Sequence, residues 1–173
     1  RAISRALDTA ALGAGATNAP TGIAGMVGVG SVSLGSSGAL TRAQLAALVK
    51  DATDANGIDA ASKAAFIIPS AVALKAYRTV SADTGQYLFK PETATFGRLG
   101  DWPCYVSDCA PAQTAIFGDW SQLYLVNHGP LEILVDRYSG SKTGNVRLVA
   151  LLDASVQAGQ VEAFSVATGV NVS

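Results

Sequence analysis

The hydrophobic periodicity of this chain changes near residue 80, and that change limits the folds that the chain can adopt. Before this point, apolar residues recur at helical spacing, which predicts helices at about 1–12, 42–55 and 70–78. After it, short apolar runs of strand length alternate with Gly and Pro. Because most helices precede most strands, this order favours an α+β fold over a regular alternation of strands and helices.

Local start signals support two of these helices. Thr41 is a good N-cap and Gln44 follows three residues later, which predicts a capping box for the second helix. A short strand at 65–68 is halted by Pro69, and Ser70 is predicted to cap the third helix. The glycine-rich residues 13–38 and the residues 82–109 are predicted to form loops, the latter with small strands.

Three strand predictions concern the C-terminal part. Two apolar runs flank Gly118 and Asp119, which predicts a tight hairpin turn at these residues. The stretch "LEILVD" alternates apolar and acidic residues, which predicts a half-buried strand with one face made of Leu131, Ile133 and Val135. The last apolar runs, 146–157 and 160–168, are predicted to form a terminal antiparallel pair.

Composition narrows the classes of protein. Among 173 residues, 49% are hydrophobic and only 14% are charged, which argues against disorder and indicates that part of the surface faces partners. The formal net charge is -1 and no Lys/Arg cluster is present, which argues against sequence-specific DNA recognition. No apolar run approaches the roughly 20 residues that span a bilayer. The chain starts at Arg1 inside a helical pattern, so we expect a truncated chain, and it shows no secretory leader. Its two cysteines, interpreted as plain thiols, favour synthesis in the reducing cytosol.

The stretch "SGSKTG" contains the sharpest catalytic motif. Ser139 and Lys142 form S-x-x-K, and Lys142 also begins K-T-G; both are motifs of serine acyl-transfer enzymes. In those enzymes the first motif opens a helix and the second lies on a separate strand, whereas here one lysine would serve both. Gly140, Gly144 and Asn145 instead predict a flexible turn.

The remaining candidates for chemistry have simple structural interpretations. His128, the only histidine, lies in a predicted turn with no G-x-S-x-G elbow in the sequence to complete a triad. Cys104 and Cys109 have no partner cysteines, so we interpret them as plain thiols and not as a zinc site. Neither glycine-rich run completes a nucleotide-binding motif. We therefore predict no catalytic, cofactor-binding or metal-binding residue.

Six short pieces, taken in order, resemble the major capsid proteins of tailed bacteriophages and prophages with the Hong Kong 97-type fold. They are "ALGAGATNAPTGIAG", "LTRAQLAALV", "AAFIIPSAVALKAY", "LGDWPCYVSDCAP", "AIFGDWSQLYLVNHGPLEILVDRY" and "VRLVALLDASVQAGQVEAFSVA". No single piece is diagnostic, but together they cover nearly the whole chain. The resemblance implies an axial domain with a central mixed sheet flanked by helices, and part of a peripheral domain with a spine helix and antiparallel strands.

Mapped onto this chain, the resemblance assigns residues 1–30 to the end of the spine helix and its exit. It assigns 31–140 to the axial domain and 141–173 to returning peripheral strands, so that "SGSKTG" would be the crossing between the two domains. Some family members form Lys–Asn cross-links, but neither Asn145 nor Asn171 matches a motif that can be transferred. No cross-linking residue is therefore predicted.

The function that this resemblance implies is structural and not enzymatic. Copies would form the pentamers and hexamers of an icosahedral shell around double-stranded DNA, with scaffold, portal or other capsid proteins as partners. The protein would lie in the virion after synthesis in the bacterial cytoplasm, with no cofactor, membrane or small-molecule substrate. The alternatives are the shell protein of an encapsulin-type compartment, a small hydrolase using Ser139 and Lys142, and a monomeric binding module.

Overall fold

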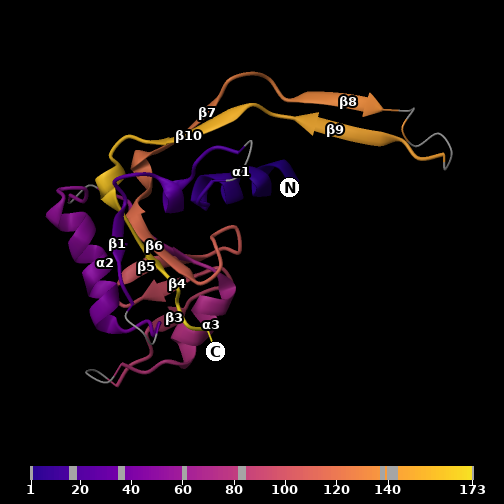
Figure 1. The fold of residues 1–173 in the computed structure, drawn as a ribbon. Helices are drawn as coiled ribbons and strands as arrows, with labels where there is room; N and C mark the ends of the chain where they lie inside the picture. The colour runs from indigo at the N-terminus through magenta and orange to yellow at the C-terminus, as the bar shows by residue number, and fades with distance from the viewer. Residues whose placement is uncertain are drawn as a thin grey trace.

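A mixed sheet of seven strands forms the body of the molecule (Figure 1). The computed structural model describes residues 2–15, 19–34, 38–59, 62–81, 85–136, 139 and 144–172. The strand order is β1-β11-β6-β2-β5-β4-β3, and the β1–β11 and β2–β5 pairs are parallel while all other neighbours are antiparallel. In chain order, the strands are β1 (Gly30–Val32), β2 (Ala64–Ile68), β3 (Phe89–Pro91), β4 (Phe96–Leu99), β5 (Trp102–Val106), β6 (Thr114–Asp119) and β11 (Phe164–Thr168).

Helices lie on both faces of this sheet. The helices α2 (Arg42–Asp54) and α3 (Ser70–Arg78) cover one face, where Phe66 and Phe117 are fully buried with ring centroids 4.6 Å apart. The helix α1 (Ala2–Leu12) and the 3-10 turn η1 (Ile23–Gly25) pack a smaller cluster against Ile116 on the opposite face. The predicted α+β class, with a mixed sheet and flanking helices, is confirmed.

The predicted start of the second helix is confirmed in detail. The Thr41 side chain accepts a hydrogen bond from the Gln44 backbone N–H, and the Gln44 side-chain oxygen accepts one from the Thr41 backbone N–H at 2.8 Å. The helix ends at Asp54, one residue before the predicted end. The short strands predicted within 82–109 are also present as β3, β4 and β5.

The predicted cap of the third helix was wrong. Pro69 occupies the N-cap position, and Ser70 is the first helical residue with no capping side chain before it. Instead, the carboxylate of Asp108, which follows β5, accepts a hydrogen bond from the Ser70 backbone N–H at 2.9 Å. Since Pro69 has no side-chain acceptor, the chain satisfies this orphan N–H from a residue distant in sequence.

The hairpin predicted at Gly118 and Asp119 was also wrong. Strand β6 continues through both residues, and all six of its residues are buried between β2 and β11. Gly118 lies directly opposite Phe164, and a Cβ atom there would lie 2.2 Å from the Phe164 ring. The glycine is therefore required by the close approach of a phenylalanine and not by a turn.

After the 3-10 turn η2 (Trp120–Gln122), the chain leaves the body in a long two-stranded projection (Figure 1). Strands β7 (Leu123–Asn127) and β10 (Ala154–Ala158) form its inner ladder, and β8 (Glu132–Asp136) and β9 (Arg147–Leu151) form its outer ladder. We call these four strands the arm. The predicted terminal antiparallel pair is therefore absent, because the runs that were expected to pair belong to β9, β10 and β11, and β11 pairs with β1 and β6 in the central sheet.

Two further predictions concern the layout of the chain. The division at residues 30 and 140 stays a prediction; β11, which lies in the last predicted segment, belongs to the seven-stranded sheet after the 3-10 turn η3 (Val161–Ala163). Within the part of the chain that the structure describes, no helix has the length and apolar character needed to cross a membrane.

Candidate assembly surface

The outer part of the arm has one face made only of apolar side chains. In the β8–β9 register, Ile133 lies opposite Ala150, and Val135 lies opposite Leu148, so these four side chains share a face. Ile133 is 64% exposed and Leu148 is 68% exposed. Isolated exposed apolar residues are common, but a continuous face of them indicates a surface that another element covers.

The opposite face of the same ladder is apolar in the middle and charged at the ends. Leu134 and Val149 lie opposite each other, between the Glu132–Leu151 pair and the Asp136–Arg147 pair. Leu134 is 55% exposed, so this face is also largely uncovered. The strand predicted here is present as β8, but its predicted half-burial was wrong, since β8 is exposed along nearly its whole length.

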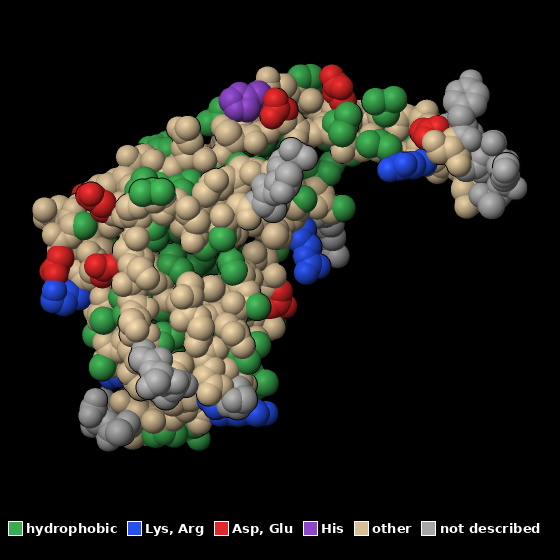
Figure 2. All heavy atoms as spheres, viewed as in Figure 1, with side chains coloured by type: hydrophobic (Ala, Val, Ile, Leu, Met, Phe, Trp, Pro, Cys, Tyr) green, Lys and Arg blue, Asp and Glu red, His purple; other side chains and the backbone are tan. Residues whose placement is uncertain are grey.

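The inner ladder has the same character. Tyr124, Leu125 and Val126 of β7 are each about half exposed. Figure 2 shows hydrophobic side chains along the arm beyond the body of the molecule. A two-stranded ribbon is marginally stable in water by itself, because it has too few neighbours to bury its apolar faces. The arm therefore has apolar surface that its own strands do not bury.

His128 lies at the junction between the two ladders. Its backbone N–H donates to the Asp153 carbonyl oxygen at 2.9 Å, and its Nε2 lies 3.0 Å from the Ser155 hydroxyl. These contacts of His128 with Asp153 and Ser155 therefore join the two chain segments of the arm between the β7–β10 ladder and the β8–β9 ladder. The structural interpretation of this histidine agrees with its contacts.

Ser139, the serine of the S-x-x-K motif, follows the end of β8. Ser139 donates from both its backbone N–H and its hydroxyl to the Asp136 carboxylate, with the N–H at 3.1 Å. These bonds form a local turn at the end of β8. Lys142 lies outside the described residues.

The two cysteines are free in this structure and differ in environment. Burial raises the pKa of the Cys104 thiol to about 12, which keeps it protonated and unreactive. Cys109 is partly exposed, and its thiol lies 3.9 Å from the Arg5 carbonyl oxygen. No group of three or more His, Cys, Asp or Glu residues capable of holding a metal ion occurs among the described residues.

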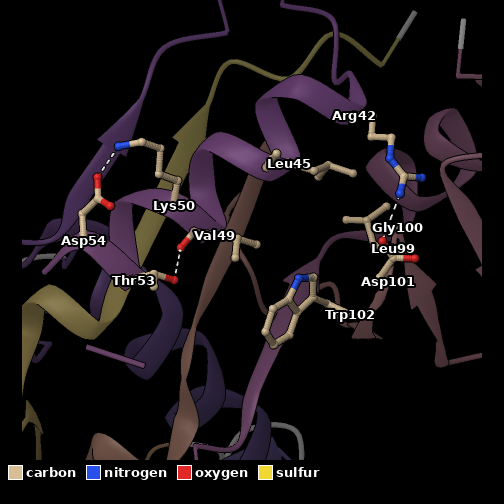
Figure 3. A pocket seen from close by; sticks show the side chains of 11 residues that line it. Arg42, Leu45, Val49, Lys50, Thr53, Asp54, Leu99, Gly100, Asp101 and Trp102 are labelled. Atoms are coloured by element: carbon tan, nitrogen blue, oxygen red, sulfur yellow. Dashed lines mark hydrogen bonds and ion pairs between the residues drawn. The ribbon is translucent and has the colours of Figure 1, made fainter. Parts of the chain in front are cut away.

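A groove of about 360 Å³ lies between α2 and the turn that joins β4 to β5 (Figure 3). Its apolar lining includes Leu45, Val49 and Trp102. Arg42 forms an ion pair with Asp101 at 3.0 Å, and Lys50 forms a second ion pair with Asp54. Because these charged groups pair with each other, the groove offers a contact surface but no pair of nucleophile and base.

Residues 1–169 match the phage capsid family. The chain belongs to this family. The resemblance seen in the six sequence pieces is thereby confirmed at the level of the family. Since the phage capsid family consists of structural proteins, it also supports the predicted absence of an enzymatic role.

Solved structures share the fold of this phage capsid family member at low sequence identity. The capsid of a native GTA particle has a TM-score of 0.68 at 20% identity, covering 98% of this chain and 62% of that chain. A structure of Mycobacterium phage Ogopogo has a TM-score of 0.66 at 19% identity, with coverages of 96% and 64%. An encapsulin complex from Synechococcus elongatus has a TM-score of 0.66 at 15% identity, with coverages of 99% and 62%.

The chain thus spans a little over three fifths of the length of these structures. A comparison with curated proteins found no match. The sequence predicted the family and the fold, but not the uncovered arm. The signal that could have indicated it is the density of apolar residues from Leu131 to Leu151 around a polar turn, in a segment whose own ladder has only two strands.

Proposed function

We propose that this chain is part of the major capsid protein of a tailed phage or prophage. Its copies associate into the pentamers and hexamers of an icosahedral shell that encloses double-stranded DNA. The observation that carries this proposal is the arm, whose apolar side chains are exposed on both faces of the β8–β9 ladder. Membership of the phage capsid family supports the same conclusion.

The arm suits assembly because it projects away from the body and cannot bury its apolar faces within its own ladder (Figure 1). A closed ring requires an interface between two different surfaces, one on each neighbouring copy. Stable protein interfaces bury about 1,600 Å² in total, so an arm that reaches a neighbour contributes a substantial share. Burying the exposed part of Ile133 is worth about 1–2 kcal/mol, and each copy repeats this gain.

The domain organisation and location follow from the same proposal. Residues 1–30 represent the end of a spine helix and its exit, 31–140 an axial domain, and 141–173 returning peripheral strands. In the assembled state the protein resides in the virion, after synthesis in the bacterial cytoplasm. Scaffold, portal or other capsid proteins are the expected partners.

A second function, the shell of an encapsulin-type compartment, has one specific observation in its favour. The encapsulin complex and the Mycobacterium phage structure have the same TM-score, 0.66, against this chain. The two functions differ in content, since one shell encloses DNA and the other encloses protein cargo. Purified particles that protect nucleic acid from nuclease support a phage shell, whereas particles that hold only a protein support a compartment.

Negative-stain electron microscopy of the complete gene product tests assembly directly. We expect uniform icosahedral particles from the natural sequence, with only monomers or small rings from the double variant Ile133→Lys and Leu148→Lys. Each substitution places a charge where the docked arm would be dry, and an unpaired buried charge opposes association strongly. Val27→Lys is the matched control, because Val27 is 97% exposed and lies outside the arm.

Dispersed monomers from the natural sequence, under every expression condition, would contradict the shell proposal. Unchanged particles from the double variant would contradict the role of the arm. Thermal unfolding of each variant separates assembly from folding, because substitutions at exposed positions change the stability of the chain itself by only about 0.5 kcal/mol.

A further inference from the structure

One face of the central sheet is covered over only part of its width. Helix α1 and η1 bury Ile116, Phe164 and Val166, which belong to β6 and β11. Farther along the same face, Ile67 lies beside Tyr105 in the β2–β5 register, and Tyr105 is 49% exposed. This part of the sheet therefore lacks the helical layer that covers the opposite face.

The uncovered part carries a hollow with an apolar lining. A groove of about 510 Å³ is lined by Ala65, Ile67, Pro103, Tyr105 and Trp120, with Lys63 at its rim. Beside it, the rings of Phe96 and Tyr105 lie 5.1 Å apart. Tyr105 is exposed and Phe96 is partly buried, and strand pairing places both on the same side of the sheet as Ile67.

Cations extend this surface to the edge of the sheet. Lys90 of β3 lies directly opposite Arg98 of β4, and both are exposed. Their neighbours Phe89 and Leu99, also opposite each other, are buried against α2 and α3, so Lys90 and Arg98 point to the uncovered side. We call this surface the open face; it consists of Lys63, Ile67, Lys90, Phe96, Arg98, Pro103 and Tyr105.

Within the part of the chain that the structure describes, the ion pairs are Arg42–Asp101 and Lys50–Asp54, so none involves these cations. Glu92 follows Lys90 by two residues and lies on the same side, so the open face has three cations, Lys63, Lys90 and Arg98, against this one carboxylate. The Asp101 carboxylate pairs with Arg42 of α2, and the Asp119 carboxylate is buried. Among the described residues, Lys90 donates to the side-chain oxygen of Gln86 and Arg98 donates to the backbone oxygen of Asp101, both of which are uncharged.

Like charges directly opposite each other across a ladder are destabilising. An anion that binds both side chains offsets this repulsion. Among anionic polymers, DNA fits the surface best, because its phosphates pair with Lys and Arg while the exposed Tyr105 ring contacts the sugars of the same backbone. An acidic peptide would satisfy the cations but leave the aromatic pair without a specific contact.

We propose that the open face binds DNA without sequence specificity, through phosphate contacts from Lys63, Lys90 and Arg98. The identification of this DNA with the content of a shell rests on the proposed function; the binding surface itself does not. Three phosphate contacts predict a weak interaction whose affinity depends on salt, in the range typical of non-specific DNA binding.

The test measures binding of the full chain to a fluorescent DNA duplex by anisotropy, at several salt concentrations. Three contacts predict a slope of about -2.7 in the plot of log affinity against log salt. The double variant Lys90→Gln and Arg98→Gln is expected to reduce the magnitude of that slope by about 1.8 and to weaken binding roughly tenfold at low salt. The matched control, Lys50→Gln and Arg78→Gln, removes the same charges from α2 and α3 and is expected to bind like the natural chain.

Equal losses in the two double variants would overturn the proposal, because binding would then follow net charge alone. A salt-independent affinity would overturn it as well. Displacement of the duplex by polyglutamate at equal charge concentration would instead assign the open face to an acidic protein. Electron microscopy of the same variants tests the shell proposal separately. If particles form but the natural open face does not bind DNA, only the DNA proposal is contradicted.

Discussion

The replacement of Asp119 by Ala or by Asn tests how the end of β6 is held. Asp119 is 3% exposed, and one of its oxygens accepts hydrogen bonds from the Lys63 N–H at 3.0 Å, the Ser121 N–H at 3.0 Å and the Ser121 hydroxyl at 2.8 Å. The carboxylate therefore ties the start of β2 and the turn η2 to the end of β6. A tight hairpin turn at this position would not require such a network.

The two substitutions differ in what they leave behind. Alanine removes the acceptor and leaves two backbone donors without a partner, which costs about 3 kcal/mol in the free energy of unfolding. Asparagine keeps a carbonyl oxygen as an acceptor and loses only the charge assistance, which costs about 1 kcal/mol. With a urea dependence of about 2 kcal/mol/M, the midpoints fall by about 1.5 M and about 0.5 M respectively.

The pH dependence of the Asn variant follows from the carboxylate. Burial by itself raises the pKa of Asp119, but hydrogen bonds from Ser121, Ser62 and Lys63 hold the pKa below its usual value of 3.8. A carboxylate whose pKa is lower in the folded state stabilises the protein above the unfolded pKa, and that stability is lost as pH falls through the folded pKa. The difference between the natural chain and Asp119→Asn is therefore expected at pH 7 and should shrink below about pH 3.8.

Urea unfolding followed by fluorescence of Trp102 and Trp120 measures both effects. The control is Asp8→Asn, which changes the same functional group at an exposed position of α1. Equal destabilisation by Ala and Asn would refute the reasoning from acceptors. A gap between the natural chain and the Asn variant that stays constant at low pH would refute the reasoning from charge.

Three further predictions follow from individual contacts. Gly118→Ala should lower stability by about 2–3 kcal/mol in thermal unfolding, because its Cβ overlaps the Phe164 ring; an unchanged midpoint would contradict the strand assignment. Asp108→Ala should lower the free energy of unfolding by about 1 kcal/mol through loss of the α3 cap, whereas Ser70→Ala should lower it by less. Urea unfolding measures both, and a larger effect of Ser70→Ala would indicate that Ser70 is the cap. Cys104, with its pKa near 12, should resist iodoacetamide at pH 8 until the chain unfolds; peptide mass mapping that finds it modified in the folded chain would contradict its burial.

The sequence predicted local elements well where their signals are local. The capping box at Thr41 and Gln44 needs only a helix that starts between them, and the structure contains that arrangement. The helical spacing in α1 and the strand before Pro69 also depend on near neighbours in the sequence. Such signals remain valid whatever the topology.

Predictions that depended on strand pairing were less successful. Gly118 and Asp119 have the composition of a turn, yet the tertiary requirement was for a small residue opposite Phe164 and an acceptor for Lys63. The alternation in β8 predicted burial of one face, but that face has no partner within its own two-stranded ladder. Pairing and coverage depend on distant parts of the chain or on other copies, which hydrophobic periodicity does not encode.

The candidate surfaces also contain features that the sequence predicted and features that it did not. The sequence predicted a turn at S-x-x-K and K-T-G, and the hydrogen bond from the Ser139 N–H to Asp136 at the end of β8 agrees with a turn. The open face was not predicted, because Lys63, Lys90 and Arg98 are far apart in sequence and come together only when β2, β5, β4 and β3 form one sheet. A search for clusters of Lys and Arg along the sequence therefore does not detect this surface.

The position of β11 has a consequence for the order of events during synthesis. β6 ends at Asp119, the arm strands follow, and only then does the ribosome produce Phe164–Thr168, the strand that lies between β1 and β6. Until that strand emerges, the nascent chain contains the arm strands and a central sheet that lacks β11. Non-local pairing of this kind folds slowly and leaves sticky segments open to premature association. The central sheet can therefore be completed only after all four arm strands have been synthesised.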